Sequence, residues 1–313
     1  MYYAPVIIPT LCRYEHFKEC MESLASNTWA AYTEVYIGLD YPAKETHREG
    51  YEKICDYLEK KKFSFSKVNI FKRESNYGVA KNVEDLRDVV RKKYDRFIVT
   101  EDDNIFSENF LEYMDTMLEK TKDLNDVFGV CGYSYPIEYL DVNGDNCSFY
   151  VNSVFPAWGY GTFFDKRDRL LSEYTHEFLI NSVKDNRKVK KLRSFGRLFF
   201  SWYINRACDE KVTYSDIDMQ LYQTLSGKVS VMPAKSLVRN MGWDGSGINC
   251  QTGSYDFSSQ ELYVGDITDT ILPTSDERES QIREFIGGLN KITWMTSLKC
   301  NIKCYLVKLG IRR

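Results

Sequence analysis

Apolar and polar positions over the first hundred residues predict strands and helices in alternation. Short apolar runs bounded by polar residues are typical of buried strands, and they lie at 4–8, 34–40, 68–74 and 97–99. Apolar residues recur at helical spacing at 14–24, 45–62 and 83–90. This alternation predicts a parallel sheet with helices on its faces, which binds ligands at the carboxyl ends of its strands.

The alternation weakens after the fourth strand. Strands are expected within 127–135, 149–155 and 228–240, and helices within 164–174, 194–208 and 215–227. A glycine-spaced aromatic turn, 155–164, precedes the first of these helices. The stretch 241–257 is rich in Gly, Ser and Asn, which is typical of a mobile loop that closes over a substrate.

Three consecutive acids, Glu101, Asp102 and Asp103, follow the fourth strand. Carboxylates held this close repel one another, so a divalent cation or a ring of hydroxyl donors would stabilise them. A solvated turn with Ser107 as the N-cap of the next helix is the alternative, and the triplet alone favours this alternative, because acids after a strand are common. Polar and turn residues that share the carboxyl edge of the sheet favour a nucleotide pocket: Pro9, Asp40, Asn76 and Asp103.

Composition narrows the classes of function. The chain has 313 residues, 43% of them hydrophobic and 28% charged, which is ordinary for a soluble globular protein. A net charge of −3 gives no global basic field and argues against nucleic acid as a partner. Neither GxGxxG nor GxxxxGK[ST] occurs, so dinucleotide and P-loop sites lack their fingerprints.

Cysteine usage and the chain start favour a location inside the cell. The nine cysteines are odd in number and contain no CxxC pair, which indicates neither a disulfide framework nor a thiolate zinc site. The first ten residues lack a basic leader, and no apolar run reaches transmembrane length.

The tail from Phe285 to Arg313 contains no acid. Lysines and arginines alternate there with apolar residues in the pattern of a basic amphipathic helix. Such a helix suits either an anionic bilayer or the protein's own core, and the sequence leaves both open.

Four ordered motifs resemble nucleotide-sugar glycosyltransferases of the GT-A fold, particularly enzymes similar to N-acetylglucosaminyltransferase I. TEDDN (100–104) resembles the EDD variant of that family's DxD motif, and FPAWGYGTFF (155–164) the turn behind the transferred sugar. SDIDMQLY (215–222) resembles the segment with the catalytic base, and NMGWDGSGIN (240–249) the mobile loop after it. The resemblance covers about 5–249 and leaves the tail unexplained.

The resemblance implies a GT-A type α/β fold, with a mostly parallel Rossmann-like sheet flanked by helices, an acceptor-binding half and a C-terminal helical tail. In these terms, 1–104 is the nucleotide-sugar-binding half and 105–260 the sugar- and acceptor-binding half of the same domain. Residues 261–313 form a C-terminal extension with the basic helix.

The resemblance also assigns roles at the donor site. Asp103 would bind Mn²⁺ or Mg²⁺ directly, Asp102 would meet the ribose or the metal's hydration shell, and Glu101 would accept a sugar hydroxyl. Asp40 would accept a hydrogen bond from uracil N3, and we prefer it to Lys81 as a nucleotide contact because a lysine in a first helical turn is usually solvated. The other residues expected to contact the donor are Pro9, Thr10, Arg13, Asn76, Trp158 and Gly159.

Inverting transfer needs one carboxylate to take the proton from the acceptor hydroxyl. Asp216 and Asp218 are two residues apart on a predicted helix, so they point in different directions. The family pattern favours Asp218, with Asp216 as the alternate and Asp244 as a more distant candidate. Some relatives supply a metal-ligating histidine where this chain has Asn249, which predicts weak metal binding without donor.

We therefore expect an inverting, metal-dependent glycosyltransferase that moves a sugar such as GlcNAc from a UDP-sugar to a glycan or lipid-linked glycan in surface polysaccharide synthesis. Its expected location is the cytoplasm, including a peripheral position on the inner face of the cell membrane. A nucleotidyltransferase is the first alternative, although 9–17 has no glycine for its phosphate loop. The second is a non-catalytic carbohydrate-binding protein with the same fold.

Overall fold

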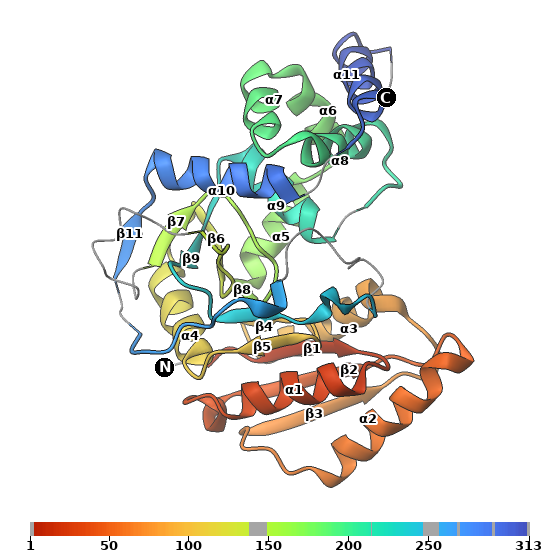
Figure 1. Cartoon of the computed structure of the whole chain (residues 1–313), viewed down its shortest axis with the longest axis vertical. Helices are drawn as coiled ribbons and strands as arrows, with labels where there is room; N and C mark the ends of the chain where they lie inside the picture. The colour runs from red at the N-terminus through yellow and green to blue at the C-terminus, as the bar shows by residue number, and fades with distance from the viewer. Residues whose placement is uncertain are drawn as a thin grey trace.

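The computed structural model describes residues 3–137, 149–213, 215–246, 257–267, 270–289 and 292–311. Within these ranges, nine strands form one mixed sheet in the order β11-β7-β9-β6-β8-β4-β1-β2-β3 (Figure 1). In that order the strands are Ile271–Pro273, Phe149–Asn152, Val229–Pro233, Val127–Cys131, Tyr160–Phe163, Arg96–Val99, Val6–Thr10, Glu34–Leu39 and Lys67–Lys72. β8, β7 and β11 run opposite to the other six, so the predicted mostly parallel sheet flanked by helices is confirmed.

Three helices cover the two faces of the first four strands. α1 (Tyr14–Ala25) and α2 (Arg48–Lys60) share one hydrophobic core with Val6 and Ile8, whereas α3 (Gly78–Arg91) shares the other core with Ile7. This division follows from the two-residue period of a strand, which sends neighbouring side chains to opposite faces. The strands and helices predicted over the first hundred residues are confirmed.

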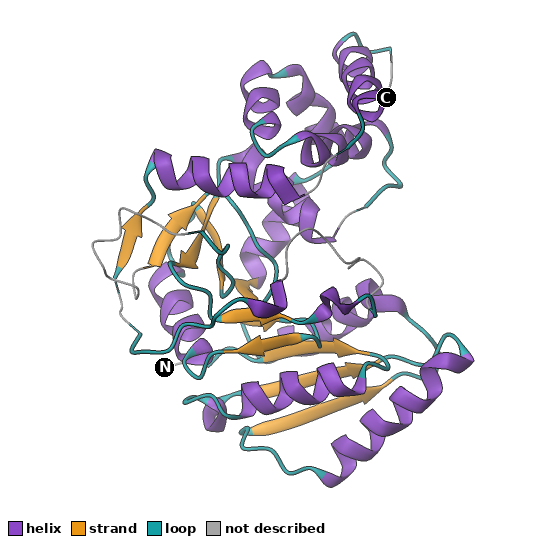
Figure 2. Cartoon of the chain, in the orientation of Figure 1, coloured by secondary structure: helices purple, strands orange, loops and turns teal. Residues whose placement is uncertain are grey.

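The remaining helices pack on both faces of the sheet and beyond its far end (Figure 2). They are α4 (Phe110–Thr121), α5 (Phe164–Glu173), α6 (His176–Lys184), α7 (Asn186–Arg193), α8 (Arg197–Cys208), α9 (Ser215–Ser226), α10 (Asp276–Leu289) and α11 (Trp294–Lys308). Short 3₁₀ turns occur at Ala30–Tyr32, Glu45–His47, Gly242–Asp244 and Phe257–Ser259.

Strand β8 joins the two halves of the sheet. It pairs antiparallel with both β4 and β6, and its Gly161 lies opposite Ile98 and Val130. A Cβ on Gly161 would lie 3.0 Å from side chains of α4, so glycine permits close packing there. The sequence predicted only an aromatic turn in this stretch, and the structure forms a strand within it.

A second, two-stranded sheet was not predicted. β5 (Asn104–Phe106) pairs antiparallel with β10 (Val238–Asn240), and Asn104 lies opposite Asn240. The prediction of Ser107 as a helix N-cap is wrong: Asn109 holds that position, and the Ser107 hydroxyl donates to the Tyr263 carbonyl at 2.7 Å. The reason is that the chain continues as a strand before α4 begins.

The C-terminal helix α11 packs on α8 and α6 (Figure 1). Its inward side chains Cys300, Cys304 and Val307 are buried. Among the described residues, no helix combines the length and apolar character that crossing a bilayer requires.

Candidate active site

The acidic triplet lies where the chain leaves β4. Asp102 and Asp103 are buried, and Glu101 is exposed. The Thr10 hydroxyl at the end of β1 donates to Asp102 Oδ2 at 2.7 Å. The Arg13 guanidinium contacts Asp102 Oδ1 and lies 2.7 Å from Asp103 Oδ2. The structure therefore brings together four predicted site residues from two parallel strands.

Arg13 is the cation of this cluster. Burial opposes its charge, but the carboxylates of Asp102 and Asp103 outweigh that effect and raise the pKa of Arg13 above its ordinary value. Burial also raises the pKa of Asp102, and repulsion from Asp103 adds to the rise against the opposing charge of Arg13. One guanidinium thus compensates two carboxylates, and any further negative group needs additional positive charge.

Asn240, on β10, holds Asp103 from the other side. Its amide donates to Asp103 Oδ1 at 2.8 Å and to Asn104 Oδ1 at 2.9 Å, and Asn240 is fully buried. The backbone N–H of Met241 donates to the Asp103 carbonyl at 2.8 Å. A Cβ on Gly242 would lie 2.2 Å from Asp103 Oδ2, so only glycine fits there. Sequence reasoning missed Asn240, because its one signal was its place at the start of the loop motif.

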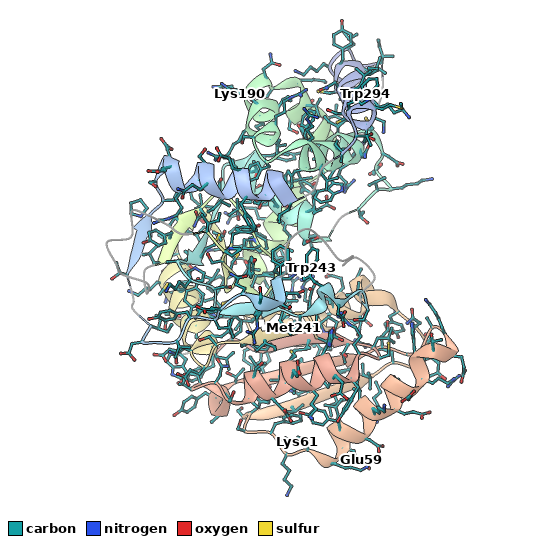
Figure 3. All side chains as sticks on the ribbon, in the orientation of Figure 1. Glu59, Lys61, Lys190, Met241, Trp243 and Trp294 are labelled. Carbon is teal, nitrogen blue, oxygen red and sulfur yellow. The ribbon has the colours of Figure 1, made fainter. Side chains whose placement is uncertain are left out.

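The first part of the predicted mobile loop crosses this site. Figure 3 shows Met241 and Trp243 in the middle of the molecule. Asp244 Oδ2 lies 3.2 Å from His16 Nε2 on α1, so the candidate base Asp244 ties the loop to the donor half. The His16 side chain is largely covered, with 19% of its surface exposed. Asn249 and the rest of 247–256 lie outside the described residues.

Asp40, at the end of β2, is buried and accepts four hydrogen bonds. Its donors are the backbone N–H groups of Tyr41 (2.9 Å), Tyr77 (2.7 Å) and Gly78 (2.8 Å) and the side-chain amide of Asn76 (3.3 Å). A carboxylate offers about four acceptor positions, so these donors fill its capacity. Asp40 therefore fixes the turn that begins α3.

The remaining donor-side residues surround the same strand ends. Asn76 also donates to the Tyr41 carbonyl at 2.7 Å. The Lys81 ammonium lies 3.1 Å from the centre of the Tyr77 ring, on an exposed side chain. Pro9 is buried within β1, where it pairs with Gly38.

Asp218 and Asp216 have different surroundings. Asp218 accepts a hydrogen bond from the Tyr174 hydroxyl at 2.8 Å and pairs with Arg206 Nε at 3.2 Å. Their side chains are only 16% (Asp218) and 11% (Arg206) exposed, so Asp218 belongs to a covered contact between α8 and α9. Asp216 has exposed surface, and partial desolvation by the surrounding protein atoms raises the pKa of its carboxyl.

Glu101 and Asp216 lie close enough for their charges to interact. The pKa of Glu101 is raised to about 8. The largest cause is desolvation by surrounding protein atoms, and the negative charges of Asp103, Asp216 and Asp102 add to it. Both Glu101 and Asp216 keep exposed surface, so a ligand can reach them. Of the two acids near the start of α9, Asp216 is the one whose charge acts on the acidic triplet.

Aromatic rings pack between the predicted sugar-side turn and the loop. The Trp158 ring centre lies 4.7 Å from that of Tyr133, 5.4 Å from Phe257 and 6.3 Å from Trp243. Gly159 has φ +65°, which favours glycine, and a Cβ there would lie 2.9 Å from Val238. Within the described part of the chain, the buried Trp243 Nε1 has no hydrogen-bond partner, so it can donate to a ligand.

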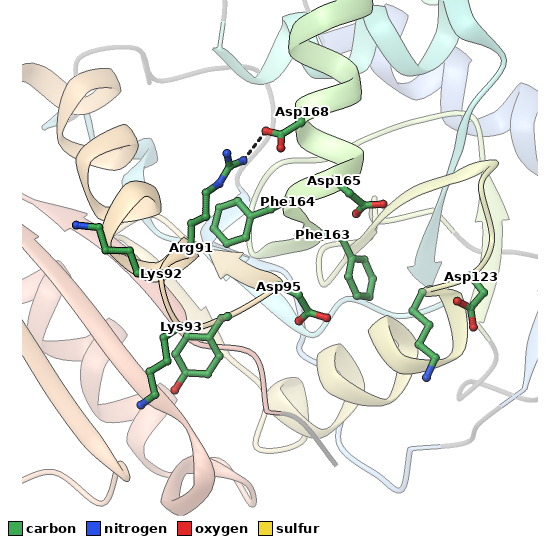
Figure 4. A pocket seen from close by; sticks show the side chains of 11 residues that line it. Arg91, Lys92, Lys93, Asp95, Asp123, Phe163, Phe164, Asp165 and Asp168 are labelled. Carbon is green, nitrogen blue, oxygen red and sulfur yellow. Dashed lines mark hydrogen bonds and ion pairs between the residues drawn. The ribbon is translucent and has the colours of Figure 1, made fainter.

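A hollow of about 670 Å³ lies away from this site, where β4 begins and β8 ends (Figure 4). Arg91 and Asp168 form an ion pair across it. Its charged lining consists of four cations and four acids: Arg91, Lys92, Lys93, Lys122, Asp95, Asp123, Asp165 and Asp168. The charges balance, so the hollow has no preference for an anionic nucleotide.

The fit of a metal ion is partial. Among the residues described, no group of three or more His, Cys, Asp or Glu side chains is arranged to hold one. The hard carboxylate oxygens of Asp103 suit Mn²⁺ or Mg²⁺, but they already accept from Arg13 and Asn240. A divalent ion would therefore need further ligands from a bound diphosphate.

Comparisons with known proteins give similarity to solved structures only. No family model matches the chain, and no curated protein matches it. A structure of residues 1–349 of S. aureus TarS has a TM-score of 0.39 and 11% identity, covering 76% of this chain and 60% of that one. A second TarS structure has a TM-score of 0.29 and 16% identity, covering 39% and 20%.

A third solved structure is the mannosyltransferase PcManGT from Pyrobaculum calidifontis in complex with GDP-Man and Mn²⁺. Its TM-score is 0.37 and its identity 12%, and the match covers 54% of this chain and 46% of PcManGT. The chain thus spans less than two thirds of each of these structures. At such identities and TM-scores the likeness assigns no function.

Proposed function

We propose that the chain is an inverting, metal-dependent glycosyltransferase that moves a sugar such as GlcNAc from a UDP-sugar to a glycan or lipid-linked glycan. The observation that carries this proposal is the electrostatic interaction of two carboxylate groups from distant parts of the chain. One is the Asp102–Asp103 pair bound to Arg13, and the other is Asp216, whose charge acts on Glu101. Sugar transfer needs both a site for the leaving diphosphate and a base for the acceptor.

On the donor side, Asp103 is the proposed protein ligand of Mn²⁺ or Mg²⁺, shared with diphosphate oxygens. The ion would supply the positive charge that stabilises the leaving diphosphate. Arg13 holds the carboxylates of Asp102 and Asp103 together, and Thr10 orients Asp102 for the ribose or the ion's hydration shell. This role for TEDDN, and the similarity to N-acetylglucosaminyltransferase I, belong to the proposal.

Asp40 shapes the nucleotide pocket in this proposal without contacting the base. Its four acceptor positions are filled by Tyr41 and the turn at 76–78, so contact with uracil N3 would require the loss of an existing bond. Asn76 belongs to the same turn, and Lys81 can move from the Tyr77 ring toward a phosphate. Pro9 is buried in β1 and supports the pocket from the sheet.

We propose Asp216 as the base in place of Asp218. Asp216 takes the proton from the acceptor hydroxyl while that oxygen forms its bond to the anomeric carbon. The bond between this carbon and the diphosphate oxygen breaks, and the diphosphate leaves with the electron pair. A raised pKa makes Asp216 a better proton acceptor, whereas Asp218 positions α9 through Arg206.

The sugar-side roles rest on the turn and the triplet. Trp158 and Gly159 support the transferred sugar through the aromatic packing beneath the loop, and Trp243 Nε1 supplies a donor. Glu101 has a pKa of about 8, so it is largely protonated at neutral pH and can donate a hydrogen bond to a sugar hydroxyl as well as accept one.

A donor panel tests the proposal. Wild-type protein should release nucleoside diphosphate from one UDP-sugar, and the release should need Mn²⁺ or Mg²⁺ and fall with a chelator. Asp103→Ala should abolish it, while Asp123→Ala, a matched change in the distant hollow, should not. Full turnover by Asp103→Ala would overturn the metal assignment. Failure to bind UDP and Mn²⁺ in calorimetry would favour the non-catalytic alternative.

A further inference from the structure

The outer face of α11 is an exposed apolar stripe. Trp294, Leu298, Ile302, Tyr305 and Leu309 are between 48% and 69% exposed. They follow one another at intervals of three or four residues, so they lie on one side of the helix. That side is opposite to Cys300, Cys304 and Val307, which pack on the protein. α11 is therefore apolar on both sides, and the protein covers one of them.

The exposed hydrophobic side chains of the described residues are concentrated in the C-terminal segment. Of the thirteen large exposed hydrophobic side chains in the described ranges, seven lie within 294–311. Single exposed apolar residues are normal on a soluble protein, whereas a contiguous patch marks a surface that binds a partner or a membrane.

Positive charge surrounds the stripe. Lys299 and Lys308 lie on α11 at the borders of the stripe, whereas Lys303 donates to the side-chain oxygen of Asn205 at 2.7 Å on the protein side. The stretch 292–311 contains no acid. The neighbouring α7, with sequence NRKVKKLR, adds five cations and no acid. The two helices are linked, since Arg193 donates to the side-chain oxygen of Asn301 at 2.7 Å. Figure 3 shows Lys190 and Trp294 at the same end of the molecule.

We propose that α11 and α7 together form a surface that binds an anionic lipid bilayer. α11 would lie in the plane of the membrane, with its apolar stripe among the acyl chains and Lys299 and Lys308 at the lipid phosphates. The cations of α7 add electrostatic attraction, and Trp294 suits the interface because its ring has an apolar body and a polar N–H.

Length and charge favour this arrangement over others. A helix of 15 residues is about 22 Å long, which is short of the about 30 Å of a hydrocarbon core, so α11 lies on a bilayer and does not span it. A second copy seated on the stripe would bring the cations of both copies together without an acid to pair them. An anionic surface matches both the stripe and its border.

The surface is connected to the candidate active site. α8 packs beneath α11, and Arg206 of α8 pairs with Asp218 of α9, the helix that begins beside Asp216. Binding through α11 would thus hold the site at a fixed height above the lipids, which suits a lipid-linked acceptor. The membrane surface itself does not rest on the proposed transferase activity.

Vesicle flotation of the full chain tests this inference. Wild-type protein should float with vesicles of phosphatidylcholine mixed with phosphatidylglycerol, should not float with phosphatidylcholine alone, and should be released by high salt. Ile302→Asp and Lys190→Glu should each lower binding by about tenfold. The matched controls Leu171→Asp, at an exposed leucine of α5, and Lys61→Glu, at the opposite end of the molecule, should bind like wild type.

Circular dichroism establishes that the variants fold, and Lys190→Glu carries the test if Ile302→Asp does not fold. Equal binding to neutral and anionic vesicles, or wild-type binding by Ile302→Asp, would overturn the inference. A dimer in sedimentation velocity that Ile302→Asp abolishes, without any lipid binding by wild type, would assign the stripe to a second copy. Donor turnover without vesicles should be unchanged in Ile302→Asp, which separates this outcome from failure of the proposed function.

Discussion

Replacing Asp216 by asparagine should lower activity, whereas replacing Asp218 by asparagine should lower stability. Both changes remove one carboxylate charge near the start of α9, so each serves as the control for the other. Asp218 is committed to a contact with Tyr174 and Arg206, and Asp216 is the acid that acts on Glu101.

Asp218→Asn should mainly lower stability. It removes the charge that pairs with the covered Arg206 and weakens the bond from the Tyr174 hydroxyl. Loss of a covered charged hydrogen bond costs about 2 kcal/mol, which lowers the melting temperature of a protein of this size by about 5 °C. The kcat should stay within about threefold of wild type, because the base itself is intact.

Asp216→Asn should mainly lower activity. The raised pKa of Asp216 means that the fold disfavours its ionised form, so a neutral asparagine costs no stability at pH 7. Loss of a general base lowers kcat by about 100-fold to 10,000-fold. The assay is transfer to acceptor, measured as released UDP, together with a thermal melt. An inactive Asp218→Asn with an unchanged melting temperature, beside a near-normal Asp216→Asn, would refute the reasoning.

Three further predictions concern the acidic triplet and its supports. The Glu101 carboxyl has a pKa of about 8 in the folded protein, against an ordinary value of 4.5. Its contribution to stability is therefore full below pH 4.5 and is lost as the pH rises through 8. Glu101→Gln should make the melting temperature less dependent on pH between these two values. Gly242→Ala should raise the Mn²⁺ concentration needed for half-maximal activity, because the Cβ of the alanine would collide with Asp103 Oδ2. The control Gly245→Ala should affect only the melting temperature, because no atom lies within 4 Å of the added Cβ. Asn240→Ala should lower the melting temperature by about 2–5 °C, because the buried oxygens of Asp103 and Asn104 lose a donor; an unchanged melt would contradict that role.

The first half of the fold was predictable from sequence because its inner strands are apolar runs and each helix shows a complete amphipathic pattern. β5, β8 and β10 are three or four residues long, and their pairing depends on partners far along the chain, as Asn104 with Asn240 illustrates. The same limit hid the support of Asp103 by Asn240, because a contact across 137 positions leaves no local pattern.

The candidate site was predictable in its residues and less so in their roles. The sequence placed Asp102, Asp103, Thr10 and Arg13 at strand ends, and the structure brings them into contact. The two-residue spacing predicted that Asp216 and Asp218 point in different directions, but not which of them interacts with the triplet. That choice depends on Arg206, which pairs with Asp218 in the folded protein. The saturated hydrogen bonding of Asp40 was likewise not predictable, because three of its four donors come from a turn more than 35 residues away.

The antiparallel course of β8 has a consequence for how two substrates could meet. β8 runs opposite to both its neighbours, so β4 and β6 on its two sides are parallel to each other. The carboxyl ends of β1, β2, β3, β4, β6 and β9 therefore all lie at one edge of the described sheet, which β8 shares through its amino end. The two halves of the described sheet are therefore parts of one hydrogen-bonded surface, on which the proposed donor and acceptor sites would both lie. Bringing a donor and an acceptor together on that rim requires movement of loops and ligands, and no rotation of one domain on another.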